Sequence, residues 1–298
     1  MSFHIGRLFH IIHISDDLPT LDAWYDDVYG PRWGIMDNTY SERDMRYASL
    51  PVIADTIIET MAPARLPGAE SMPVARFEAK FGRRWHSLAW YVDDVGEIYD
   101  HLQERGIRLT GHHGSTTGSR PERGPIYTHP RDTHTQLEFY SPVPDIDFRF
   151  HDDFDVAAWE RHPIGIKRLA YATVVVGDVA RATELFTEAL HGRVICERRS
   201  TLTKTQNVYV LIGSDTVVEL AQPLDSESLA GRDLATNGDM CHAIAWHVND
   251  LDATAQYLAS KNIRVIDRDD ATLVADPADT FGAITRFTTD AIPGDPRG

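Results

Sequence analysis

Four segments of the chain share one pattern of apolar and polar positions. In each, a run of apolar, β-branched and aromatic residues ends in aspartate, and apolar residues at helical spacing follow. The segments are FHIIHISDDLPTLDAWY, HSLAWYVDDVGEIYDHL, YATVVVGDVARATELF and HAIAWHVNDLDATAQYL. The run before the aspartate predicts a strand and the spacing after it predicts a helix. The aspartates (Asp17, Asp94, Asp178 and Asp250) stand where the N-cap of each helix belongs.

Glycine-bounded apolar runs follow each predicted helix, as in GIRLTG from Gly106 and VYVLIGSDTVVEL from Val208. These runs predict further strands, so the repeated unit is β-α-β-β-β. The second half of the chain repeats the first in other motifs as well. DTIIETMAP from Asp55 returns as DTVVELAQP from Asp215, and HPRDTH from His129 returns as DPADTF from Asp276. Motif pairs in the same order indicate a duplicated domain.

Composition narrows the classes of partner. The chain has 298 residues with 42% hydrophobic and 25% charged residues, which is typical of globular proteins, and its formal net charge is -16. Such a negative surface disfavours nucleic acid and anionic membranes, so we expect neither as a partner. The N-terminus has no signal-peptide pattern and no apolar run is long enough to cross a bilayer, which predicts a cytoplasmic protein. No glycine-rich nucleotide-binding motif occurs, and nucleotide cofactors are not expected.

With these motifs the chain resembles the vicinal-oxygen-chelate superfamily, the fold of glyoxalase I, methylmalonyl-CoA epimerase, bleomycin-resistance proteins and type I extradiol dioxygenases. HPRDTH is similar to a turn of the epimerases. The resemblance implies an α+β fold in which four βαβββ modules pair into two glyoxalase-like domains with curved mixed sheets. The predicted domains are residues 1–143 and 166–298. Residues 144–165, rich in prolines and acids, are predicted to be the linker.

The resemblance also implies a metal site, because the family takes one ligand from the first strand and one from the last strand of each module. His10 lies seven positions before Asp17, the usual family spacing, and Glu59 and Glu138 occupy last-strand positions. His86 is the first-strand candidate of the second module. The expected ligands are therefore His10, Glu59, His86 and Glu138, holding a divalent ion such as Zn, Ni, Co, Mn or Fe.

His86 departs from the family pattern, since seven positions before Asp94 is Ser87. On a regular strand His86 would share the face of Leu88 and Trp90, away from the cavity. Either the strand bulges and brings His86 into the cavity, or the family position is a serine here. His242 is displaced in the same way in the second half, so a structural role shared by both histidines is an equal alternative to metal binding by His86.

The second half offers fewer ligands. Its equivalent positions carry Tyr171, Glu219 and either Thr285 or Arg286, which predicts a degenerate site. His13, two positions beyond Ile11, is interpreted as a structural histidine rather than a ligand. The GHHGSTTGSRPERG segment from Gly111 predicts a loop.

The resemblance leaves three functions open. The first is a lyase or isomerase that moves a proton next to a metal-polarised carbonyl of a small molecule, with Glu138 as the catalytic group. The second is an Fe(II)-dependent extradiol-type ring-cleavage dioxygenase using His10, His86 and Glu138. The third is a non-catalytic small-molecule-binding protein of the bleomycin-resistance type. Family members often dimerise, so a homodimer is an expected alternative to the monomer.

Overall fold

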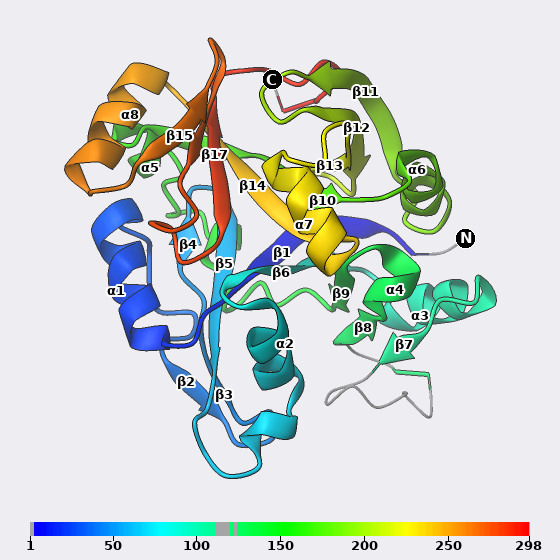
Figure 1. Cartoon of the computed structure of the whole chain (residues 1–298). Coiled ribbons are helices and arrows are strands. Elements are labelled where there is room, and N and C mark those ends of the chain that lie inside the picture. The colour runs from blue at the N-terminus through cyan, green and yellow to red at the C-terminus, as the bar shows by residue number, and fades with distance from the viewer. Residues whose placement is uncertain (1–2, 111–119, 122–123, 298) are drawn as a thin grey trace.

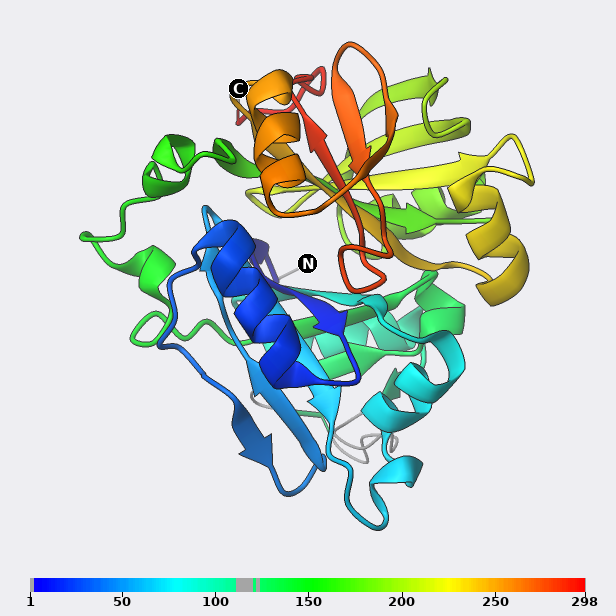
Figure 2. The ribbon, with the colours of Figure 1, turned by 60° about the vertical axis from the view of Figure 1, so that its left-hand side comes forward.

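The computed structural model describes residues 3–110, 120–121 and 124–297. Most of the predicted loop from Gly111 lies outside these residues. The fold is α+β, with one mixed sheet formed by strands of the first half and another by strands of the second half. Figure 2 shows the second half, green-yellow to red, stacked above the first half, blue to green, with the green connecting segment running along one side.

The first half contains two βαβββ modules joined by an additional helix. Its elements are β1 (Ile5–Ile14), α1 (Leu18–Tyr29), β2 (Thr39–Ser41), β3 (Arg46–Ser49), β4 (Val52–Ile53), β5 (Thr56–Pro63), η1 (Ala69–Ser71), α2 (Pro73–Phe81), β6 (Arg84–Val92), α3 (Val95–Glu104), β7 (Leu109–Thr110), β8 (Ile126–Thr128), α4 (Pro130–Thr133) and β9 (Gln136–Tyr140). The sheet order is β2-β3-β5-β1-β6-β9-β8-β7, with β4 paired to β5.

The second half repeats this arrangement after a connecting segment that contains η3 (Phe148–Phe150) and α5 (Ala158–Arg161). Its elements are β10 (Ile166–Val175), α6 (Val179–Glu188), β11 (Arg193–Ser200), β12 (Thr205–Ile212), β13 (Thr216–Pro223), α7 (Leu229–Asn237), β14 (Met240–Val248), α8 (Leu251–Ser260), β15 (Val265–Arg268), β16 (Thr272–Ala275) and β17 (Ile284–Thr288) (Figure 1). The sheet order β11-β12-β13-β10-β14-β17-β16-β15 matches that of the first half. The predicted fold of four βαβββ modules is confirmed.

Within each module the first and last strands pair in parallel, as β1 does with β5 and β6 with β9. Adjacent modules meet through antiparallel first strands, β1 with β6 and β10 with β14. The centre of the first sheet therefore has the order β5-β1-β6-β9, and that of the second has β13-β10-β14-β17. In each sheet this order places the first and last strands of both modules beside one another. The arrangement explains how residues far apart in sequence reach one cavity.

The predicted N-caps are confirmed in all four modules. The carboxylates of Asp94, Asp178 and Asp250 accept backbone N–H bonds of 2.9, 3.1 and 2.9 Å at α3, α6 and α8. Asp17 does the same at α1 over a longer 3.5 Å and also accepts from the Thr20 hydroxyl at 2.6 Å. Each cap satisfies an amide that the helix leaves without an internal partner.

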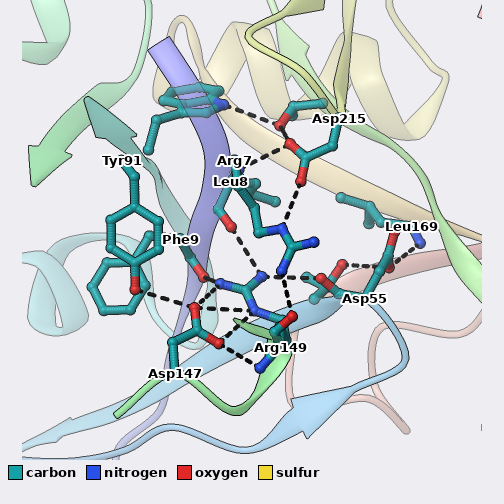
Figure 3. Close-up of polar contacts among 12 residues, drawn as sticks. Arg7, Leu8, Phe9, Asp55, Tyr91, Asp147, Arg149, Leu169 and Asp215 are labelled. Atoms are coloured by element: carbon teal, nitrogen blue, oxygen red, sulfur yellow. Dashed lines mark hydrogen bonds and ion pairs between the residues drawn. The ribbon is translucent and has the colours of Figure 1, made fainter. Parts of the chain in front are cut away.

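The two halves share a hydrophobic core and a pair of crossed hydrogen bonds. The largest buried cluster contains Leu88 and Trp90 of the first half together with Ile244 and Trp246 of the second. The amide of Leu169 donates to Asp55 at 2.8 Å, and the amide of Leu8 donates to Asp215 at 2.9 Å (Figure 3). The aspartates that open the DTIIETMAP and DTVVELAQP motifs therefore each bind the first strand of the other half.

The segment predicted to be a linker contributes a buried ion pair to the first half. Arg149 binds Asp147 at 2.6 Å and donates to the carbonyls of Leu8, Phe9 and Asp55 (Figure 3). Near the C-terminus, Arg297 binds Asp295 and donates to the equivalent carbonyls of the second half, those of Leu169, Ala170 and Asp215. Each half thus ends in an Asp-x-Arg motif that ties the first strand of the half to the turn before the last strand of its first module, β5 or β13. Among the described residues, no helix is long and apolar enough to cross a membrane.

Candidate functional site

The structure brings His10, Glu59 and Glu138 together in the first half. They lie on β1, β5 and β9, and each side chain is buried. His10 Nε2 is 3.1 Å from Glu59 Oε2 and 3.6 Å from Glu138 Oε2. The two carboxylates therefore approach the same ring nitrogen from different strands.

A cavity of about 110 Å³ adjoins this group, and both carboxylates line it. Its lining is mixed, with apolar and polar side chains from β1, β3, β5, β6, β8 and β9 and from the start of α2. The lining residues other than the two carboxylates are Ile12, Asp44, Arg46, Met61, Pro73, Val74, His86, Thr110, Tyr127, Gln136 and Tyr140. A partly apolar cavity with a few convergent polar groups is typical of a small-molecule site.

Each carboxylate has polar partners besides His10. Arg46 Nη1 lies 3.2 Å from Glu59 Oε1. Glu138 Oε1 accepts hydrogen bonds from Ser87 at 2.7 Å and Gln136 at 2.9 Å, and Glu138 Oε2 accepts one from Tyr140 at 3.0 Å. Burial alone would raise the pKa of Glu138, but His10, Ser87 and His86 together lower it to about 2. Glu138 is therefore anionic near neutral pH.

The structure answers the question about His86 in favour of a bulge. Ile11 pairs with Leu88, whereas His13 pairs with Trp85, so that two steps along β1 correspond to three along β6. The extra residue brings His86 to the cavity while Ser87 also faces Glu138. His86 Nδ1 lies 3.0 Å from the Ser87 hydroxyl, and burial lowers the pKa of His86 to about 4. His86 is thus neutral and is linked to Glu138 through the Ser87 hydroxyl.

The donor types suit a divalent cation, but the ligands are not preassembled around one position. Neither ring nitrogen of the buried His10 makes a well-aligned hydrogen bond with a described residue, which leaves its lone pair for another partner. Nevertheless, within residues 3–110, 120–121 and 124–297 no group of three or more His, Cys, Asp or Glu side chains is spaced as a metal site. Binding an ion would require the Arg46 and Tyr140 contacts to loosen.

His13 has the structural role that the sequence predicted. Its Nδ1 lies 2.9 Å from the Tyr25 hydroxyl, and its Nε2 lies 3.1 Å from the carbonyl of Phe281 in the second half. Burial lowers its pKa to about 4.

Several residues of the site were missed by sequence reasoning. Gln136 and Tyr140 flank Glu138 at two-residue spacing, and strand alternation alone places them on its face. Arg46 lies in a short strand that no motif marked, and its pairing with Pro63 in β5 is what brings it to Glu59.

The equivalent position in the second half holds an arginine. Ala245 pairs with Arg286 as Ala89 pairs with Glu138, so Arg286 rather than Thr285 takes the last-strand place. Glu219 binds this guanidinium at 2.7 Å. The carboxylate also accepts hydrogen bonds from Thr173, Asn207 and Tyr209. A protein cation therefore occupies the neighbourhood of the carboxylate in this half.

Comparisons with known proteins agree with this architecture. Residues 170–277 match the family model described as Glyoxalase/Bleomycin resistance protein/Dioxygenase superfamily. A mutant of 4-hydroxymandelate synthase from Streptomyces coelicolor is similar over 98% of this chain and 95% of its own, with a TM-score of 0.65 and 13% identity. At that identity the likeness shows the fold alone.

Methylmalonyl-CoA epimerase from Mycobacterium tuberculosis is 23% identical over 41% of this chain and 87% of its own, with a TM-score of 0.39. No curated protein sequence matches the chain. The family match lies within the second half of the chain, and the sheet of the first half repeats the strand order of that half.

Proposed function

We propose that the first half is a divalent-metal-dependent lyase or isomerase, which moves a proton next to the carbonyl of a small substrate. The observation that carries this proposal is the approach of two buried carboxylates, Glu59 and Glu138, to the ring of His10 beside one cavity. Buried anions are costly unless they are paired, and a cation at this point would stabilise both.

In this proposal His10, Glu59 and Glu138 hold the ion, and His86 is the fourth candidate ligand. A bound divalent ion would supply a Lewis acid that polarises a substrate carbonyl and makes the adjacent C–H more acidic. The protein side chains supply the rest. The apolar Ile12, Met61 and Val74 limit water in the cavity, while Arg46 offers a charge that suits a carboxylate or enolate oxygen.

Glu138 is proposed as the group that moves the proton. With three hydrogen-bond donors and a pKa of about 2 it is a weak base, since a general base works best with a pKa near the working pH. Substrate binding must therefore displace donors such as Tyr140 and Gln136. Their loss would raise the pKa of Glu138, because burial then acts with less opposition.

The arrangement favours this chemistry over the iron-dependent alternative. A dioxygenase site takes two histidines and one carboxylate, so it would need His86 as a principal ligand rather than as a fourth one. The possible metal ligands nearest His10 are instead the two carboxylates of Glu59 and Glu138. Hard oxygen ligands suit ions such as Mg²⁺ or Mn²⁺ at least as well as iron.

The metal is tested by elemental analysis of protein purified without chelators. We expect the wild-type chain to retain a stoichiometric divalent ion and His10→Ala to lose it. The matched control is Tyr171→Phe, since Tyr171 pairs with Ala245 as His10 pairs with Ala89, and this variant should keep the ion. A wild-type chain that neither retains nor binds a divalent ion would favour a non-catalytic binding protein.

The reaction is tested by NMR in deuterated water with a panel of α-oxygenated carbonyl compounds and acyl thioesters. We expect deuterium to enter a carbon next to the carbonyl, and Glu138→Gln to slow this exchange by at least about 100-fold, the lower end of what a positioned acid or base contributes. Oxygen consumption with a catechol and iron, without such exchange, would overturn the proposal in favour of the dioxygenase.

A further inference from the structure

We propose that the second half has a ligand site of its own, in which His242 and Arg286 bind a small apolar molecule that carries a hydroxyl beside a carboxylate, such as a 2-hydroxy acid. This site is separate from the His10 group and does not depend on the function proposed for it.

The site is a cavity of about 270 Å³ between the turn after β11, the start of α7 and strands β14, β16 and β17. Leu202, Leu229, Ala230, Val274 and Ile284 give it an apolar wall. Charged side chains line it as well, and they are Lys204, Glu227, Arg232, Asp267 and Arg286. An apolar wall with a small number of polar groups suits an organic ligand better than a free ion.

His242 lines this cavity and is buried, and its hydrogen bonding fixes which nitrogen carries the proton. Its Nδ1 lies 2.6 Å from Asp233 Oδ2, and Arg84 Nη2 donates to the same oxygen at 2.7 Å. Burial raises the pKa of Asp233, but these two donors outweigh burial and lower it overall, so Asp233 is an anion. An anion can only accept, and His242 Nδ1 must therefore be the protonated nitrogen.

His242 Nε2 is then a lone-pair acceptor without a partner among the described residues. Burial lowers the pKa of His242, which keeps the ring neutral and the acceptor available. A buried acceptor without a hydrogen bond costs free energy, and a ligand hydroxyl would remove that cost. The pairing of Asp233, His242 and an open Nε2 also holds the ring in one orientation before the ligand arrives.

Arg286 supplies the complementary donor. Its Nη1 donates to Glu219 at 2.7 Å and contacts Thr173, whereas its Nε has no partner among the residues that the structure describes. The side chain is buried and lines the same cavity. A carboxylate of the ligand would pair with this guanidinium. Together, an acceptor from His242 and a charged donor from Arg286 match a hydroxyl next to a carboxylate.

The test compares two probes on the full chain by isothermal titration calorimetry. 3-Phenyllactate carries the hydroxyl and the carboxylate on an apolar body, and 3-phenylpropanoate lacks only the hydroxyl. We expect the wild-type chain to bind 3-phenyllactate about 10-fold more tightly, the equivalent of one hydrogen bond to a previously unpaired buried group.

Variants locate the binding. In His242→Asn the amide can replace Nδ1 toward Asp233 but offers nothing in place of Nε2, so the 10-fold preference should disappear while both probes still bind. Arg286→Met should weaken both probes, and circular dichroism checks that it remains folded. His10→Ala should leave both affinities unchanged whether or not the first half binds a metal.

The proposal is overturned if neither probe binds, if both bind the wild-type chain equally, or if the preference persists in His242→Asn. Loss of binding in His10→Ala would also overturn it by placing the probes in the other cavity. Failure of the metal assay on the first half would leave this result unaffected, because the proposed binding residues His242 and Arg286 belong to the second half.

Discussion

Glu59 and Glu219 occupy equivalent strand positions, and their partners show how single residues make the two halves differ. Glu59 and Glu219 both face a central first strand, pairing with Ile12 and Thr173. In the second half Glu219 forms an ion pair with Arg286, which lies on β17 of the next module. In the first half the last-strand residue is another carboxylate, Glu138, so two anions share one histidine. One exchange of charge sign therefore separates a closed ion pair from a site able to accept a cation.

The burial of His13 makes the stability of the fold depend on pH. His13 is bonded at both ring nitrogens, and burial lowers its pKa from 6.5 to about 4. Between pH 4 and 6.5, His13 therefore binds a proton in the unfolded chain but not in the folded chain. The contribution of His13 to the free energy of unfolding is therefore fully present above pH 6.5. It decreases as the pH falls toward 4, by up to about 1.4 kcal/mol per pH unit.

We expect urea unfolding at pH 7, 6 and 5 to show this decline in the free energy of unfolding. His13→Gln removes the titrating group and should make the decline shallower, although His86 and His242 still contribute in the same direction. An unchanged slope in His13→Gln would show that folding does not shift the pKa of His13.

At the scale of elements, the helices begin where a local signal places them. The caps at Asp178 and Asp250 satisfy amides three residues ahead, so α6 and α8 begin directly after them. We expect Asp178→Ala and Asp250→Ala each to lower the free energy of unfolding by about 1 kcal/mol in urea titrations. Asp252→Ala, in the first turn of α8 but outside the cap, is the control and should cost clearly less. Equal losses in cap and control would show that charge near the helix terminus matters more than the cap bond.

The same scale explains what the sequence could and could not predict. Strands, helices and caps follow from short-range patterns, and the duplicated motifs gave the relation between His10, Glu59 and Glu138. The bulge in β6 was one of two alternatives that the sequence left open, because only the pairing of this strand with β1 shows the extra residue. Arg46 was missed for the same reason, since its contact with Glu59 depends on the register of β3 against β5. The Asp-x-Arg motif occurs in the sequence at both Asp147 and Asp295. Its partners could not be predicted, because they are backbone carbonyls distant in sequence.

At the scale of the molecule, the two halves are bound to one another by their own repeated residues. Asp55 and Asp215 each accept the amide of the first strand in the opposite half, and Arg149 and Arg297 bind the carbonyls of those same aspartates. Arg84 adds a link between the two candidate sites, since it begins the strand that carries His86 and binds the Asp233 that orients His242. Loss of the crossed bonds should therefore loosen the halves without destroying either sheet.

We expect the wild-type chain to unfold in urea as one cooperative transition, and Asp55→Ala with Asp215→Ala to separate it into two. Each substitution leaves a partly buried amide without its partner, at a cost of about 1–3 kcal/mol. That cost falls on the contact between halves, so the less stable half should unfold first. Far-ultraviolet circular dichroism and tryptophan fluorescence would then give different midpoints, whereas they should coincide in the exposed control Asp270→Ala. Coincident midpoints in the double variant would mean that the shared core around Trp90 and Trp246, rather than the crossed aspartates, makes the two halves fold as one.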